Sequence, residues 1–171
     1  IDVADGEVLT LESVNNTATV SLGRASTLTG SGSIRFSGTQ TINFTSPFEL
    51  TATSTALDLG VSFITLTGSA FTIGAGGFFE LTADTVNADL TNNGHLRVTA
   101  NTSTLNGAFA NGGTLELVGT SGSNATLVVA DGFTNTGLIT LDNSHASSTR
   151  SATLTLSTGT VSYTHLRAHE T

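Results

Sequence analysis

Apolar and polar residues alternate along most of this chain, and the alternation recurs within a fixed motif. Three segments, 90–98, 109–117 and 133–141, align without gaps on the pattern apolar-x-Asn-x-Gly-x-apolar-x-apolar. Alternation with a period of two is typical of strands that bury one face. The glycine of the motif returns after 19 and then 24 residues. Such a period is typical of solenoids, in which each coil stacks on the one before it.

Weaker copies of the motif lie upstream of the three full ones. Segment 28–36 has glycine in place of the asparagine, segment 73–81 has alanine there, and segment 42–50 keeps only the apolar alternation. Residues 51–66 do not align with the motif. The connections are too short for crossover helices, so we expect an all-β chain folded as a parallel, right-handed β-helix. Short strands with frequent turns also fit an antiparallel β-sandwich, which is the alternative fold.

The alternation assigns the side chains that face the axis of the predicted coil. Coils stacked about 4.8 Å apart would join these side chains into one continuous core. The inward positions of the full copies are Leu90, Leu96, Val98, Phe109, Leu115, Leu117, Phe133, Ile139 and Leu141. We expect six phenylalanines to thicken the N-terminal half of the core, namely Phe36, Phe44, Phe48, Phe63, Phe71 and Phe79.

The asparagines and glycines of the motif are predicted to lie at corners of the coil. We expect Asn92, Asn111 and Asn135 to stack as an internal ladder, each amide bonding the coil above and below. A ligand-binding strip is the other interpretation of this column. Glycine tolerates positive φ, and we expect the corner to need it. The turn glycines are Gly32, Gly77, Gly94, Gly113 and Gly137.

The residue between the last two apolar positions of each copy is predicted to point outward. In successive copies this column reads Arg35, Glu49, Glu80, Arg97 and Glu116. We expect Arg35 to pair with Glu49, and Arg97 to pair with a glutamate on a neighbouring coil. Exposed pairs contribute only about 0–1 kcal/mol each, so their main role would be to fix the register of the coils. A charged strip that contacts a partner is the alternative.

Composition excludes several classes of function. The chain has a formal net charge of −8 and no lysine, whereas a nucleic-acid-binding protein needs a basic face. It has no cysteine, which excludes a disulfide scaffold and a thiolate metal site. No apolar run approaches the roughly 18 residues of a membrane span, so we expect no membrane insertion by this segment.

No group of residues predicts catalysis, a cofactor or a metal site. Glycoside hydrolysis needs two carboxyl groups about 5–9.5 Å apart. Asp84 and Asp89 are close in sequence, but they fall on different predicted faces. His95 and His145 have no partner at a ligand-like spacing, so we interpret both as surface residues.

The last eleven residues, 161–171, differ in composition from the rest of the chain. They contain the only tyrosine and two of the four histidines. They resemble the translated read-through of a sequencing adapter, which implies a non-native tail, disordered or irregular. The zinc-like spacing of His165 and His169 therefore carries no weight. We expect residues 1–160 to be a β-helix repeat segment, a fragment of a larger protein with flanking domains.

The repeat Phe-x-Asn-x-Gly-x-(Leu/Ile)-x-Leu, in a chain rich in Thr, Ser, Gly and Asn, resembles parallel β-helix bacterial surface proteins. These are the filamentous haemagglutinin and autotransporter-passenger type, and the resemblance spans most of residues 28–160. It implies secretion to the cell surface and a non-catalytic role as a rigid rod or a weak multivalent surface. Its partners would be glycans or the surfaces of host or other cells. The alternative is a fragment of a carbohydrate-active β-helix enzyme, a polysaccharide lyase or glycoside hydrolase.

Overall fold

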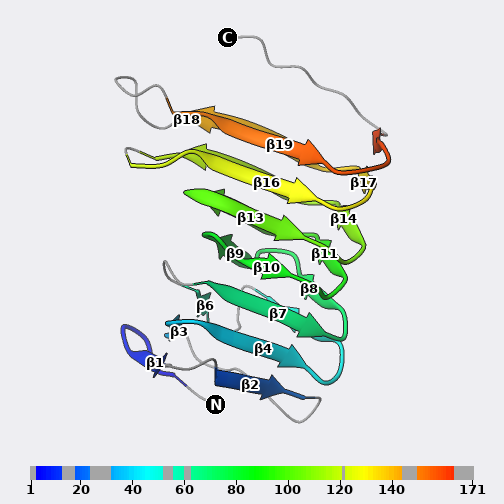
Figure 1. Ribbon diagram of the computed structural model, residues 1–171. Coiled ribbons are helices and arrows are strands. Elements are labelled where there is room, and N and C mark those ends of the chain that lie inside the picture. The colour runs from blue at the N-terminus through cyan, green and yellow to red at the C-terminus, as the bar shows by residue number, and fades with distance from the viewer. Residues whose placement is uncertain are drawn as a thin grey trace.

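The strands of this chain stack one above another from the N-terminal to the C-terminal end (Figure 1). The computed structural model describes residues 3–12, 18–23, 32–51, 56–59, 63–120, 122–143 and 150–163. Every strand pair within these ranges is parallel. The fold is therefore a parallel β-solenoid. The predicted β-helix is confirmed, and the antiparallel β-sandwich is excluded.

Successive strands follow one another around three sides of the solenoid. The first side contains two sheets and consists of β1 (Val8–Glu12), β3 (Ser33–Ser37), β6 (Ala56–Asp58), β9 (Phe78–Leu81), β12 (His95–Thr99), β15 (Thr114–Gly119) and β18 (Leu138–Asn143). The second side is a seven-stranded sheet of β2 (Ala18–Leu22), β4 (Gln40–Phe44), β7 (Ile64–Gly68), β10 (Thr85–Val86), β13 (Asn101–Leu105), β16 (Ala125–Val129) and β19 (Ala152–Leu156). The third side is a six-stranded sheet of β5 (Phe48–Leu50), β8 (Phe71–Ile73), β11 (Leu90–Asn92), β14 (Phe109–Asn111), β17 (Phe133–Asn135) and β20 (Val161–Tyr163).

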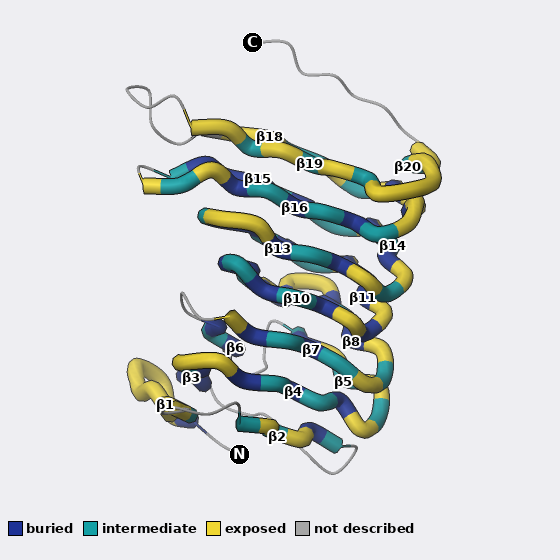
Figure 2. The backbone as a smooth tube through the Cα atoms, viewed as in Figure 1, coloured by how far each residue is buried: buried dark blue, intermediate teal, exposed yellow. Residues whose placement is uncertain are grey.

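The core lies between the three sides and follows the predicted alternation. Seven of the nine inward positions in the full copies are buried, and Ile139 is half-buried against the core. Leu141 was expected to face inward but is 53% exposed. It lies on β18, which ends its sheet, so no described strand covers it from above. Figure 2 shows the same trend, with burial in the middle coils and exposure in β1, β19 and β20.

The phenylalanines behave as predicted with one exception. Phe36, Phe44, Phe71 and Phe79 are fully buried, and Phe48 is half-buried against the core. The prediction for Phe63 is wrong, because its side chain is 67% exposed. The next residue, Ile64, is buried, so the alternation of the strand turns its neighbour toward solvent.

Two upstream copies pair differently from the motif alignment. Leu90 pairs with Phe71 and Asn92 pairs with Ile73, so the copy aligned as 73–81 begins two residues earlier. Four residues, rather than two, then connect β8 to β9. Phe48 and Leu50 pair with Phe71 and Ile73 on the third side, whereas the motif alignment placed them on the first.

The predicted tail starts inside the solenoid. Val161–Tyr163 form β20, which pairs in parallel with β17. The first three residues of segment 161–171 therefore continue the third side rather than forming irregular structure. The remainder, residues 164–171 with His165 and His169, lies outside the described residues, as does His145.

Candidate functional site

A charged cluster lies on the outer face of β9, β12 and β15. Arg97 pairs in register with Glu80 on one side and Glu116 on the other. Arg97 Nη1 lies 3.6 Å from Glu80 Oε2, and Arg97 Nε lies 3.4 Å from Glu116 Oε2. His95 Nε2 lies 3.0 Å from the same Glu116 oxygen. The structure thus brings Glu80, Arg97 and Glu116 together, with His95 as a fourth member.

The cluster forms a shallow acid–base surface rather than an enclosed cleft. Its four side chains are between 27% and 40% exposed. Thr99 Oγ1 donates to Glu80 Oε1 at 3.3 Å, and the ring of Phe78 meets His95 edge-on at 5.2 Å. Solvent screens ion pairs at this exposure, so each contributes at most about 1 kcal/mol. The alternating charges favour the correct register of three neighbouring coils.

Two members of the predicted charge column pair elsewhere. Arg35 Nε donates to Asp58 Oδ2 at 2.7 Å across β3 and β6. The predicted pairing with Glu49 is wrong, because Glu49 lies on β5 of the third side, opposite Thr72. Triplets of the form apolar-x-apolar occur on every side of the solenoid. The motif alone therefore could not show which side Glu49 lies on.

The asparagine column forms a hydrogen-bonded ladder. Asn92 Nδ2 donates to Asn111 Oδ1 at 2.7 Å, and Asn111 Nδ2 donates to Asn135 Oδ1 at 2.6 Å. All three side chains are buried, so no ligand can reach them. The same column continues below the ladder with the apolar residues Leu50 and Ile73. The column is therefore an internal support and not a ligand-binding strip.

The predicted turn glycines are required for a reason other than positive φ. Gly32, Gly77, Gly94, Gly113 and Gly137 all lie outside the positive-φ region. A β-carbon added to any of them would meet a carbonyl oxygen of the neighbouring coil well inside van der Waals contact. For example, the β-carbon of residue 113 would clash with the Gly94 oxygen. These glycines allow successive corners to stack closely.

Asp84, which we considered from the sequence only as a carboxyl partner for Asp89, is a buried carboxyl group. It follows the corner between β9 and β10 and is 1% exposed. Its Oδ1 accepts from the Ile64 amide at 2.9 Å, and its Oδ2 accepts from the Thr82 amide at 2.7 Å. Its own amide donates to Ser103 Oγ at 3.2 Å. Asp84 therefore joins three successive coils at this corner. The alternation over residues 84–86 places it inward and could have revealed it.

Burial makes Asp84 the expected source of a pH dependence of stability. Desolvation raises the pKa of Asp84 from 3.8 to about 7, although the amides of Thr82 and Ile64 oppose the shift. Between pH 3.8 and about 7, the Asp84 carboxyl group therefore keeps its proton in the folded state, whereas it has lost that proton in the unfolded chain. We expect Asp84 to reduce the free energy of unfolding by roughly 1.4 kcal/mol per pH unit as the pH rises through this range.

Urea denaturation at several pH values measures this contribution. The Asp84→Asn variant should lose the Asp84 part of the slope, whatever its absolute stability. Asp89→Asn is the matched control, because it makes the same substitution at an exposed aspartate. Equal slopes for the wild type and Asp84→Asn would contradict the assignment.

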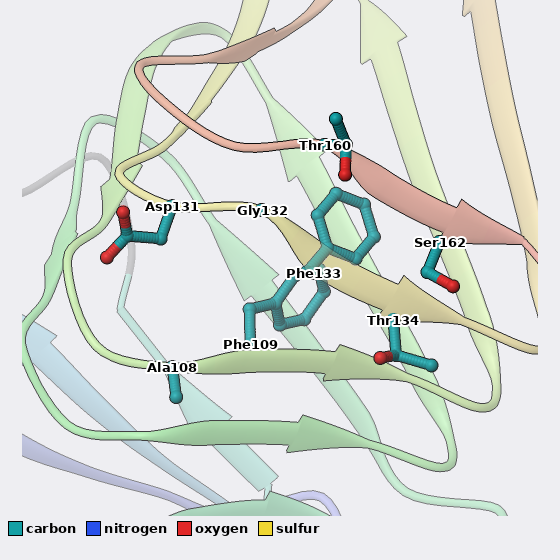
Figure 3. Close-up of a pocket in the computed structure, with 8 residues that line it drawn as sticks. All are labelled: Ala108, Phe109, Asp131, Gly132, Phe133, Thr134, Thr160 and Ser162. Atoms are coloured by element: carbon teal, nitrogen blue, oxygen red, sulfur yellow. The ribbon is translucent and has the colours of Figure 1, made fainter.

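A hollow of about 470 Å³ lies where the second side turns into the third, near the C-terminal end (Figure 3). The rings of Phe109 and Phe133 lie 4.8 Å apart at its base, but they are only 6% and 4% exposed. The carboxylate of Asp131 accepts a hydrogen bond from Thr158 at 2.6 Å. The hollow offers hydroxyl groups but little aromatic surface on which a sugar could stack. It is lined by Ala108, Phe109, Asp131, Gly132, Phe133, Thr134, Thr160 and Ser162.

Comparison with known proteins gives no family for this chain. No protein-family model, no curated protein and no solved structure matches it. Within the described ranges, no three His, Asp or Glu side chains are grouped closely enough to hold a metal ion. The same part of the chain contains no helix with the length and apolarity of a membrane span.

Proposed function

We propose that this chain is a structural and adhesive repeat segment of an exported bacterial surface protein. The proposal rests on the stack of parallel coils, which is continuous through the seven strands of the second side, and on the internal amide ladder. Each inner coil is hydrogen-bonded above and below, so the stack resists bending and transmits load along its axis. Such a rod suits a segment that spaces other domains from a cell surface.

The outward positions supply the adhesive part of the proposal. Most outward residues on the second and third sides are Thr, Ser or Asn, which both donate and accept hydrogen bonds. A single shallow contact of this kind is weak, but repeated contacts along a rod add through multivalency. The favoured partners are therefore extended glycans on host or other cell surfaces.

A glycan array probed with the chain in two forms tests this proposal. The monomer should bind weakly, and the same chain clustered on a tetrameric carrier should bind a subset of glycans much more strongly. The chain should release no reducing ends from those glycans. Absence of glycan binding in the clustered form would contradict the adhesive role, and turnover of any polysaccharide would contradict a purely structural one.

The charged cluster favours a second candidate, a carbohydrate-active β-helix enzyme. Glu80 and Glu116 flank Arg97, so two carboxylates and a cation share one surface. If a polysaccharide is cleaved, Glu116→Gln should abolish cleavage, because it removes the carboxylate shared by His95 and Arg97. Glu49→Gln, on the third side, is the matched control and should leave cleavage unchanged.

A further inference from the structure

The outer face of the second side carries a column of threonines in register. Each of Thr19, Thr41, Thr65, Thr85 and Thr104 is paired with the next across neighbouring strands. The column continues with Val128 and Thr155. Five consecutive strands of the sheet therefore present the same side chain at the same position.

Flanking columns widen this row into an array. Thr102, Thr126 and Thr153 are paired across β13, β16 and β19, two residues before the central column. Ser21, Asn43 and Thr67 are paired across β2, β4 and β7, two residues after it. We call the outward residues of these three columns the threonine face.

The threonine face is neutral although the chain is acidic. The described outward residues of β2, β4, β7, β10, β13, β16 and β19 include no Asp, Glu, Arg or His. The formal net charge of −8 is carried elsewhere in the chain. A face without charge does not suit a nucleic acid, an anionic lipid surface or a charged glycan, because none of these could form ion pairs with it. It suits an uncharged partner.

The hydroxyl groups of the central column are available to such a partner. Within the described part of the chain, Thr41, Thr65, Thr85 and Thr104 are partly exposed, and their hydroxyls make no hydrogen bond to protein. A β-branched side chain on a strand is stiff about χ1, so each position holds its hydroxyl and methyl in a fixed orientation. Adjacent strands lie about 4.8 Å apart, and positions i and i+2 lie about 6.7 Å apart.

We propose that the threonine face binds ice. Hydroxyls fixed at these two spacings can hold water oxygens at separations close to the two repeat distances of the prism face of hexagonal ice. The methyl groups between them are apolar and restrict the orientation of the adjacent first-shell water. Each contact is weak, but the array makes many at once on a rigid support. A crystalline neutral polysaccharide is less favoured, because Phe63 is the one aromatic residue among the described outward positions of this side.

Slow freezing of a dilute solution of the chain tests this proposal. The wild type should be retained in the growing ice and should inhibit ice recrystallisation. The double variant Thr65→Lys, Thr104→Lys should lose both effects, because two long charged side chains would hold the face away from the lattice. The matched control is Thr72→Lys, Thr91→Lys on the third side, where the two threonines are paired in a single outward column. It should behave as the wild type.

The outcomes separate ice binding from general adhesion and from misfolding. Circular dichroism melts should show that both double variants keep the wild-type fold. Exclusion of the wild type from ice would overturn the proposal, as would equal loss of ice binding in the two variants. Retention on crystalline cellulose without retention in ice would also overturn it and would assign the threonine face to a polysaccharide. If the chain does not bind ice, the proposed role as an adhesive rod is unaffected, because that role is tested separately on glycans.

Discussion

Replacing Phe71 by alanine is expected to reduce the free energy of unfolding by about 3–5 kcal/mol. Phe71 is fully buried at the centre of an aromatic stack. Its ring lies parallel to Phe44 at 5.2 Å and to Phe48 at 6.0 Å, and it meets Phe79 edge-on at 4.9 Å. Truncation would leave a cavity that three coils share, and rigid strands on every side limit collapse into it.

Guanidinium denaturation followed by circular dichroism measures this loss. Phe63→Ala is the matched control, because the same side chain there is 67% exposed. A surface truncation of this kind usually changes stability by no more than about 0.5 kcal/mol. A loss below about 1 kcal/mol for Phe71→Ala, or equal losses for the two variants, would show that the stack is not the centre of the core.

Replacing Asn111 by leucine is expected to cost about 2–4 kcal/mol. Asn111 is the middle member of the amide ladder and bonds both neighbours. The substitution would leave Asn135 Oδ1 without its donor and would take away the acceptor of Asn92 Nδ2. Both atoms are buried, so water cannot replace the lost partner.

A triple variant distinguishes the ladder from simple packing. The column already holds Leu50 and Ile73 in the lower coils, so its backbone accepts apolar side chains. Replacing Asn92, Asn111 and Asn135 together by leucine removes all three side-chain amides, so no amide of the ladder is left without its partner. We expect the triple variant to lose much less than three times the loss of Asn111→Leu, since changing every partner is less costly than changing one. Additive losses measured by denaturation would contradict the ladder.

The full copies of the motif allowed much of the fold to be predicted. Leu90 and Phe109 pair as the gapless alignment requires, and the asparagines two residues later pair likewise. Those copies have the same corner, two residues between the third side and the first. The segment after Ile73 has a longer corner, which breaks the alignment even though the local alternation is intact. Periodicity thus predicts strands reliably, whereas the length of a corner decides which strands pair.

The charged cluster and the buried carboxyl group of Asp84 are two features that we did not predict from the sequence pattern. His95 and Glu116 are 21 residues apart, and only the register of β12 against β15 shows that they meet. The burial of Asp84 was not predicted, because an aspartate is rarely buried without a partner. Its partners are mainly backbone amides, which no sequence pattern displays. The sequence pattern indicates which side of a strand each residue faces, whereas contacts between residues on neighbouring coils are seen only in the structure.

Consecutive strands of the second side stack at one fixed spacing, and this spacing can be measured in solution. The chain has no cysteine, so spin labels can be placed at chosen pairs of introduced cysteines. Thr41 and Val128 are four strand steps apart, and Thr41 and Thr155 are five. Electron paramagnetic resonance should give backbone separations of about 19 and 24 Å, a difference of one strand spacing. Equal distances for the two pairs, or a shorter distance for the second, would contradict the solenoid.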